Sequence, residues 1–191
     1  PMDSLEKIAE EIRNCRKCSL AKTRTNAVPG EGDISRGIMF VGEAPGRNED
    51  LQGRPFVGQA GKLLEDMLRS IGLSRDDVFI TNVVKCRPPN NRNPTEWEIF
   101  ICSPYLERQL KVIRPKIVCT LGFFSTKYMM GRFGVEVKSI SRVQGRIYNF
   151  EEFSILPMYH PAAILYKRNL EKKFREGFEK LREFLREKEI L

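Results

Sequence analysis

The chain has 191 residues, of which 41% are hydrophobic and 30% are charged, so it can form one ample hydrophobic core but is short for two domains. Its 33 Lys and Arg against 25 Asp and Glu give a net charge of +8, which favours nucleic acid or another polyanion as a partner. No apolar run approaches the ~20 residues of a membrane-spanning helix, and the acidic, amphipathic start is unlike a signal peptide. We therefore expect one domain over residues 1–191 of an intracellular protein, with Pro1 interpreted as a remnant of cloning. The abundance of Lys, Arg and Glu suits a hot environment.

Helices and strands alternate in the first half of the chain. Apolar residues recur at helical spacing in residues 3–14, the run 38–41 is typical of a buried strand, and residues 59–71 show one apolar helical face that stops at Gly72. Residues 77–82 form a second apolar strand that ends at Asn82. After the loop RPPNNRNP, we expect Asn93 to cap a helix with Pro94 in its first turn, running to about residue 113 with a disturbance at Pro104.

The alternation continues in the second half. Residues 116–122 are predicted as a strand, 123–133 as a helix and 153–160 as a strand that ends at His160. The apolar stripe after Asn169 predicts a helix packed on the core. This order predicts an α/β fold with a parallel sheet and helices on both faces. Three of the four strands end in polar or glycine-rich motifs, GEAPG, TN and MYHP. Those ends should meet at one site, because ligands of such sheets bind beyond the carboxyl ends of the strands.

Four of the five cysteines indicate a metal site. Cys15 and Cys18 form a C-x-x-C pair, which in a cytosolic protein signals metal or redox chemistry rather than a structural disulfide. Cys86 follows a strand end and Cys102 lies on the next helix, so both reach one point if the proline-rich loop folds back. Cys119 lies within a strand, where a buried free thiol is expected. Four thiolates suit either a tetrahedral zinc ion or an iron-sulfur cluster, and the residues alone do not choose between them.

Three loop motifs, GEAPGRNEDLQGRPFVGQAGKLL, TNVVKCRPPNNRNP and HPAAILY, occur in this order together with the four cysteines. Together they closely resemble the family 4 uracil-DNA glycosylases, the iron-sulfur enzymes of thermophilic archaea and bacteria, from about Cys15 to the last helix. The resemblance implies a uracil-DNA glycosylase-like three-layer fold with a central four-stranded parallel sheet. It implies release of uracil from single- or double-stranded DNA, leaving an abasic site for base excision repair. It also implies a structural 4Fe-4S cluster on Cys15, Cys18, Cys86 and Cys102.

An enzyme of this kind flips the base out of the DNA into a pocket. Phe56 offers that base a stacking face. Asn82 can pair with uracil, which presents an acceptor at O4 beside a donor at N3, whereas cytosine presents the reverse order. Backbone amides from Gly42 to Ala44 can hold a uracil carbonyl. His160, the only histidine, can donate a hydrogen bond to O2 as negative charge builds on the departing base.

Two carboxylates complete the predicted pocket. Glu43 is expected to position water or to stabilise the positive sugar of an oxocarbenium-like transition state. The similar family 1 enzymes carry an aspartate one residue later and a tyrosine two residues beyond it, where this chain has Ala44 and Gly46, so their aspartate mechanism does not carry over. In the absence of that tyrosine, Glu49 is our choice for the wall that excludes the C5 methyl of thymine, with a solvated loop acid as the alternative.

The loop after His160 is expected to grip DNA. Ile164 or Leu165 can wedge into the base stack where the uracil left, with ordinary core packing as the alternative. Basic side chains in this loop and beside a predicted cluster cysteine can meet phosphates. These candidates are Lys85, Arg87, Lys167 and Arg168.

Two other classes of protein fit part of the sequence. In an electron-transfer or redox-sensing protein the cluster would be the active part, with no need for Asn82 or His160. A zinc-stabilised DNA-binding module would bind without catalysis. Iron content and release of free uracil distinguish the three. We expect a monomer in a prokaryotic cytoplasm, associated with the nucleoid, and no motif indicates a sliding clamp as a partner.

Overall fold

The computed structural model describes residues 2–191, so Pro1, interpreted above as a remnant of cloning, lies outside the described residues. The strands are β1 (Glu31–Gly32), β2 (Ile38–Gly42), β3 (Phe79–Asn82), β4 (Ile117–Leu121), β5 (Tyr148–Asn149) and β6 (Ser154–Met158). The helices are α1 (Leu5–Arg13), α2 (Leu20–Thr23), α3 (Arg47–Gln52), α4 (Gln59–Ser70), α5 (Glu96–Ile113), α6 (Phe123–Gly131), α7 (Ile140–Val143), α8 (Pro161–Tyr166) and α9 (Glu171–Glu187). Short 3-10 turns occur at η1 (Arg75–Asp77), η2 (Pro89–Asn91) and η3 (Arg168–Leu170).

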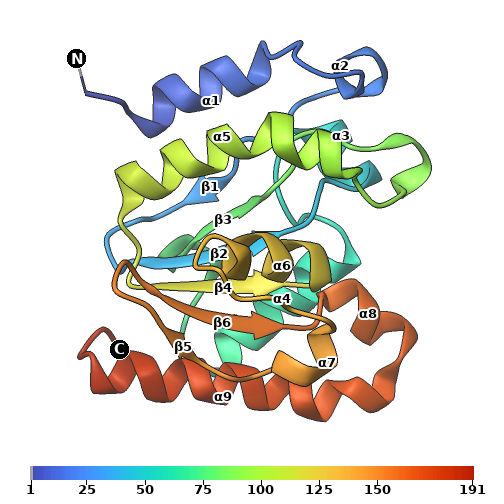
Figure 1. The fold of residues 1–191 in the computed structure, drawn as a ribbon. Coiled ribbons are helices and arrows are strands. Elements are labelled where there is room, and N and C mark those ends of the chain that lie inside the picture. The colour runs from blue at the N-terminus through green and yellow to red at the C-terminus, as the bar shows by residue number, and fades with distance from the viewer. Residues whose placement is uncertain (1) are drawn as a thin grey trace.

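The strands form one mixed sheet in the order β1-β3-β2-β4-β6-β5 (Figure 1). Its inner four strands pair in parallel, β3 with β2, β2 with β4 and β4 with β6. The two-residue strands β1 and β5 add to the two edges in antiparallel orientation. The prediction of a central sheet of four parallel strands is confirmed only in part, because the whole sheet is mixed and has six strands. Two residues are too few to show the alternation by which a strand is recognised in a sequence.

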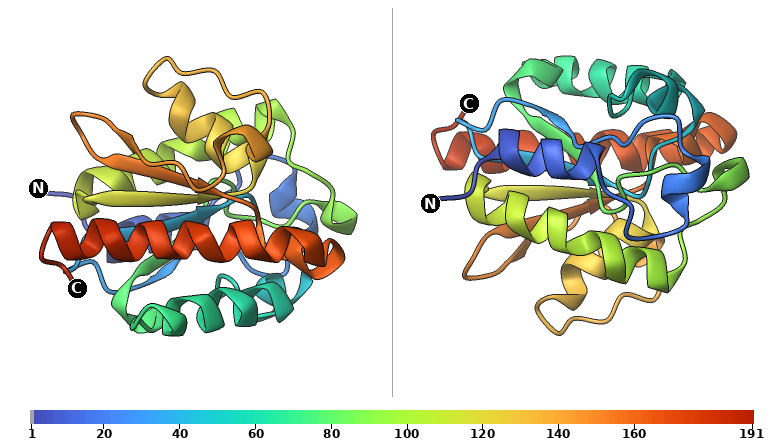
Figure 2. Two further views of the ribbon diagram at one scale, coloured as in Figure 1. Left: turned by 90° about the horizontal axis from the view of Figure 1, so that it is seen from below. Right: turned by 90° about the horizontal axis from the view of Figure 1, so that it is seen from above.

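The inner strands are buried on both faces, and alternate side chains enter two separate cores. On β2, Ile38 and Phe40 pack with α4 and α9, whereas Met39 and Val41 pack with α5 and α6. Figure 2 shows α4 and α9 side by side on one face of the sheet. The result is three layers, helix, sheet and helix. In the described part of the chain, no helix is long and apolar enough to cross a membrane.

A third core lies outside these layers, between the N-terminal segment and α5. Ile8 and Ile12 of α1 pack there against Tyr105, beside Cys86 and Cys102. In the figures, α1 runs along the outer side of α5 (Figures 1 and 2). The amphipathic helix predicted over residues 3–14 is confirmed, with Ser4 as its cap.

Two helix starts differ from the prediction. The helix that was expected to be capped by Asn93 begins at Glu96, because Thr95 and Glu98 form a capping box that satisfies its first amides. It then runs through Pro104 without ending. The segment after His160 is not a loop: Pro161 occupies the first turn of α8, a position that suits its fixed φ and missing N–H.

Candidate active site

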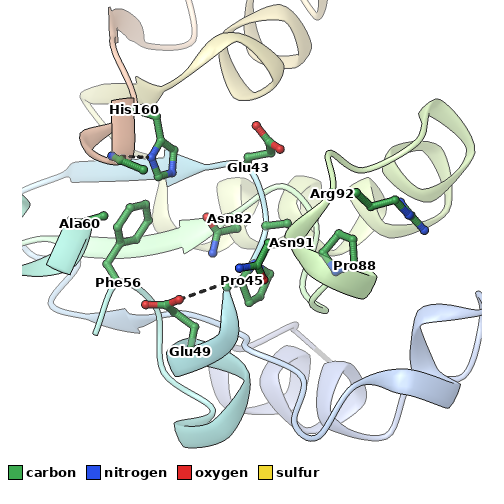
Figure 3. A pocket seen from close by; sticks show the side chains of 13 residues that line it. Glu43, Pro45, Glu49, Phe56, Ala60, Asn82, Pro88, Asn91, Arg92 and His160 are labelled. Carbon is green, nitrogen blue, oxygen red and sulfur yellow. Dashed lines mark hydrogen bonds between the residues drawn. The ribbon is translucent and has the colours of Figure 1, made fainter. Parts of the chain in front are cut away.

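The carboxyl ends of β2 and β3 and the residues that follow β6 meet at a cavity of about 310 Å³ (Figure 3). That volume suits a small planar ligand. The cavity is lined by Glu43, Ala44, Pro45, Gly46, Glu49, Phe56, Ala60, Asn82, Pro88, Asn91, Arg92, His160 and Ala162. All the residues that the sequence suggested for a uracil pocket line this cavity except Gly42, which lies behind it.

Asn82 is the last residue of β3 and stands opposite Gly42 in the parallel register of β2 and β3. Its side chain is 2% exposed, and its amide oxygen has no hydrogen-bond partner among the described residues. A buried acceptor without a partner is costly, so it marks a place where a ligand donor belongs. A Cβ on residue 42 would overlap this oxygen, and glycine is therefore required for Asn82 to lie where it does.

Phe56 forms the next wall of the cavity. Its ring stacks on the His160 imidazole with ring centroids 5.5 Å apart and planes inclined by 27°. The same ring passes close over β2, because a Cβ on Gly42 would lie 2.7 Å from the Phe56 Cζ atom. The φ angle of Phe56 is +49°, in the left-handed region that non-glycine residues seldom adopt. The ring thus lies between His160 and Gly42, on a residue whose backbone is strained.

His160 caps α8 and presents one ring nitrogen to the helix. Its Nδ1 accepts a hydrogen bond of 3.1 Å from the Ala162 N–H, so Nδ1 carries no proton and Nε2 is the donor of the neutral ring. Burial lowers the pKa of His160 to about 4, and the charge of Glu49 opposes this only partly. The imidazole is therefore a neutral hydrogen-bond donor at physiological pH.

Glu43 is the first residue after β2. Its carbonyl accepts a hydrogen bond of 3.0 Å from the Val84 N–H, which fixes its backbone beside the end of β3. Among the described residues no hydrogen bond reaches the carboxylate of Glu43, and burial raises its pKa to about 7. A carboxylate that titrates near neutral pH in a cavity is typical of a group with a chemical role.

Glu49 lines the cavity but is not a solvated loop acid. Its carboxylate accepts hydrogen bonds from the backbone N–H groups of Gly46 at 3.0 Å, Val57 at 2.9 Å and Gly58 at 3.1 Å. It therefore ties the loop after β2 to the loop that carries Phe56. Figure 3 shows its side chain on the floor of the cavity, below Phe56.

The candidate DNA contacts separate into exposed and buried groups. Leu165 is 38% exposed, and Lys167 and Arg168 are exposed beside it. Ile164 is 3% exposed and packs with α4 and α9 in the core, so its expected insertion into DNA is wrong. The reason is that α8 is helical and turns Ile164 inward. Tyr166, which the sequence reading passed over, is 88% exposed next to Leu165.

The burial of Lys85 contradicts the phosphate contact that was predicted for it. It is 1% exposed, and its ammonium donates to Thr81 Oγ1 at 2.6 Å, the Asn82 carbonyl at 2.7 Å and Gln109 Oε1 at 2.7 Å. Because its side chain points inward, Lys85 connects the end of β3 to α5 through buried hydrogen bonds. Its neighbour Arg87 is half-buried and donates from Nε to the Asn91 side chain at 2.6 Å.

The loop between Cys86 and α5 supplies cavity residues that sequence reasoning missed. Pro88, Asn91 and Arg92 line the opening, and the Arg92 guanidinium forms two hydrogen bonds of 2.8 Å with Glu98. The signal was present in the proline and asparagine content of RPPNNRNP, which indicates a rigid irregular loop but not the direction in which it folds.

The four cysteines come together around a second, smaller pocket lined by Cys15, Cys18, Cys86 and Cys102. All are free thiols. The Lys85 backbone N–H points at Cys102 Sγ at 3.3 Å, and Arg24, a residue not foreseen from the sequence, donates to Cys86 Sγ at 3.3 Å and to the Cys15 carbonyl at 2.7 Å. Cys119 lies apart, fully buried in β4. In residues 2–191, no group of His, Cys, Asp or Glu is arranged for a single metal ion.

Comparison with known proteins gives the class and then the family. The family model for the uracil DNA glycosylase superfamily matches residues 29–186. The type-4 uracil-DNA glycosylase of Sulfurisphaera tokodaii is 59% identical over 95% of this chain and 85% of its own length. Those of Archaeoglobus fulgidus and Thermotoga maritima are 51% and 40% identical, over 98% and 95% of this chain and 96% and 95% of their own lengths. The chain therefore belongs to the uracil-DNA glycosylase superfamily, and within it to the type-4 family, as its motifs predicted.

Proposed function

We propose that this protein is a monofunctional uracil-DNA glycosylase that flips uracil out of DNA and hydrolyses its N-glycosidic bond. Free uracil and an abasic site are the products, as in base excision repair. The observation that carries the proposal is the buried, unpartnered amide oxygen of Asn82 beside the rings of Phe56 and His160. This combination offers a flat pyrimidine a stacking surface and an acceptor for a ring N–H.

Recognition of uracil follows from the hydrogen bonds that Asn82 can make. Its oxygen accepts from uracil N3–H and its amide nitrogen donates to O4. Cytosine has no proton on N3 and carries an amino group at C4. The same amide would then place its oxygen against an acceptor and its nitrogen against a donor, so neither hydrogen bond forms. Phe56 stacks on the base, and the backbone N–H groups of Glu43 and Ala44, which line the cavity, hold a uracil carbonyl. Glu49, on the cavity floor, forms the wall against the C5 methyl of thymine.

Bond cleavage depends on His160 and Glu43. As the bond between C1′ and N1 breaks, electrons move onto the base, and the neutral Nε2–H of His160 donates to O2, where charge collects. The Glu43 carboxylate orients the water that attacks C1′ and stabilises the positive sugar. One proton of that water passes to the Glu43 carboxylate as its oxygen bonds to C1′, and the uracil anion takes up a proton from solvent after it leaves; Glu43 returns its proton to solvent. The raised pKa of Glu43, about 7, suits a group that receives a proton near neutral pH.

The four cysteines of the second pocket can serve as the ligands of an iron-sulfur cluster. Four thiolates are the usual ligand set of such a cluster. The family supports this assignment, because the relatives that match nearly the whole chain are type-4 uracil-DNA glycosylases. Cys15, Cys18, Cys86 and Cys102 would hold a 4Fe-4S cluster, which when bound supplies a structural crosslink between the N-terminal segment, the end of β3 and α5.

DNA meets the protein at the rim of the cavity. The exposed Leu165 fills the space vacated by the base, and Arg87, Lys167 and Arg168 contact phosphates. All of these functions belong to a single domain, which we expect to act as a monomer on chromosomal DNA inside a prokaryotic cell.

The test is incubation of the purified protein with an oligonucleotide that contains one uracil, followed by chromatography of the released bases. The proposal predicts free uracil, an abasic site that alkali cleaves, and no release of thymine from the matched oligonucleotide. An electron-transfer protein or a DNA-binding module would release no base. Binding without release would therefore contradict the proposal.

A further inference from the structure

Phe56 keeps a backbone conformation that must be held by its surroundings. A left-handed non-glycine residue such as this one, with φ of +49°, is strained and persists only where neighbouring groups enforce it. The chain bends so tightly here that a Cβ on Gly61 of α4 would overlap the Phe56 carbonyl. The position of the stacking ring thus depends on what holds the carbonyls of this turn.

Arg75 binds the two backbone carbonyls of this turn from outside the cavity. Its Nη1 donates to the Phe56 carbonyl and its Nη2 to the Pro55 carbonyl, both at 2.6 Å. The Arg75 side chain is only 12% exposed, and hydrogen bonds from a charged donor are roughly twice as strong as neutral ones. The planar guanidinium fork matches two successive carbonyls, which a lysine ammonium cannot do.

Arg75 is in turn anchored to the sheet. Its Nη2 lies 3.5 Å from Glu31 Oε2, and Arg54 makes two further hydrogen bonds with Glu31, at 2.8 and 2.7 Å. Glu31 belongs to β1 and pairs with Ile80, two residues before Asn82 on β3. The turn that carries the stacking ring is therefore tied to the strand that carries the reading amide.

We infer that Arg75 is a positioning residue for uracil excision, which sets the place of the Phe56 ring relative to Asn82. The inference rests on the proposed function, since it takes Phe56 as the surface on which uracil stacks. Arg75 is not among the residues that line the cavity, so its effect on the reaction passes through Phe56. A residue that merely stabilised the fold would act whether or not the ring was present.

A double-mutant cycle tests this difference. Single-turnover uracil release is measured for wild type, Arg75→Met, Phe56→Ala and the double variant, at a temperature where circular dichroism shows all four folded. Arg75→Met should lower the rate by about tenfold or more, because small displacements of a positioning group cost 10- to 100-fold. In the Phe56→Ala background the same change should alter the rate by less than about twofold, the signature of coupled residues.

Two further variants sharpen the result. Arg75→Lys keeps the positive charge near Glu31 but loses the fork, so it should behave like Arg75→Met, and it serves in the cycle if the methionine variant does not fold. Arg69→Met removes an exposed arginine that pairs with Glu65 on the same side of the molecule and should leave the rate unchanged. Equal effects of Arg75→Met with and without Phe56, or full activity of Arg75→Lys, would overturn the inference. Failure of the wild type to release uracil would instead overturn the proposed function and the inference with it.

Discussion

The side-chain oxygen of Asn82 lies where a Cβ on residue 42 would be, so only glycine at position 42 leaves room for it. The two residues are register partners at the ends of β3 and β2, and the Phe56 ring also lies close to the point that this Cβ would occupy. The geometry of the pocket therefore depends on the absence of one methyl group.

Gly42→Ala tests this contact. The added Cβ would displace both the Asn82 amide and the Phe56 ring, so we expect uracil release to fall about 100-fold, as a displacement of about 1 Å in a positioned group can cost. Single-turnover rates and thermal melting should be measured together. Gly131→Ala is the matched control, because a Cβ there meets nothing within 4 Å, and its melting temperature should stay the same or rise. A Gly42→Ala protein with the wild-type rate would contradict this account of the pocket.

The pH dependence of the rate should report Glu43. Its pKa is raised to about 7, so the carboxylate that acts in the reaction is protonated below that pH and charged above it. The single-turnover rate should rise with pH through about 7 and then level off. His160, with a pKa near 4, stays neutral over this range and adds no second step. Glu43→Gln should be slower and should lose the rise; a rise that survived in this variant would assign the titration to another group.

The raised pKa of Glu43 also predicts that removing the charge of this carboxylate stabilises the folded protein. Because the pKa of Glu43 is about 7 in the folded protein against 4.5 for a free side chain, the folded state binds more protons between these values. Its contribution to the free energy of unfolding therefore falls as the pH rises through this window. Glu43→Gln should melt at a higher temperature than wild type at pH about 8, by a larger margin than at pH about 5. An equal margin at both values would show that burial does not penalise the charge.

The pattern of residues was enough to predict that the strand ends meet and that four of the cysteines lie together, but not the direction of every side chain. Asn82 ends an apolar strand, His160 and Cys86 each follow one, and strand ends in a parallel sheet meet at the same edge. Lys85 and Ile164 were misassigned because basic and aliphatic residues in a polar loop look alike whether they face solvent or the interior. The three acceptors of Lys85 come from Thr81, Asn82 and Gln109, the last of them distant in the sequence.

Other features depend on contacts that no local pattern shows. The φ angle of Phe56 is strained, and its carbonyl accepts a hydrogen bond from Arg75, which is 19 residues away in the sequence. Arg24 donates to Cys86 across 62 residues. The start of α5 could have been read correctly, because Thr95 and Glu98 have the spacing of a capping box. Asn93 before Pro94 is also a typical start of a helix, but the helix is capped by Thr95, whose capping box with Glu98 forms two hydrogen bonds.

The four cysteines proposed to hold the cluster and the core residue Cys119 should respond differently to substitution. Cys102→Ser should lose iron and acid-labile sulfide, lower the melting temperature and weaken DNA binding, since the N-terminal segment, β3 and α5 would lose their common crosslink. Cys119→Ala changes a thiol buried in β4, away from that pocket, and should keep its iron. Iron analysis, melting curves and DNA affinity are the measurements. A Cys102→Ser protein that lost iron yet kept wild-type melting and affinity would refute a structural role.

The final measurement is single-turnover release of uracil from an oligonucleotide with one uracil, by wild type, Asn82→Ala and His160→Ala. Asn82→Ala removes both hydrogen bonds that read uracil and His160→Ala removes the donor to O2, so each should lower the rate by about 100-fold or more while the proteins stay folded and bind DNA. If wild type releases uracil and both variants match it within about twofold, this cavity is not where uracil is excised.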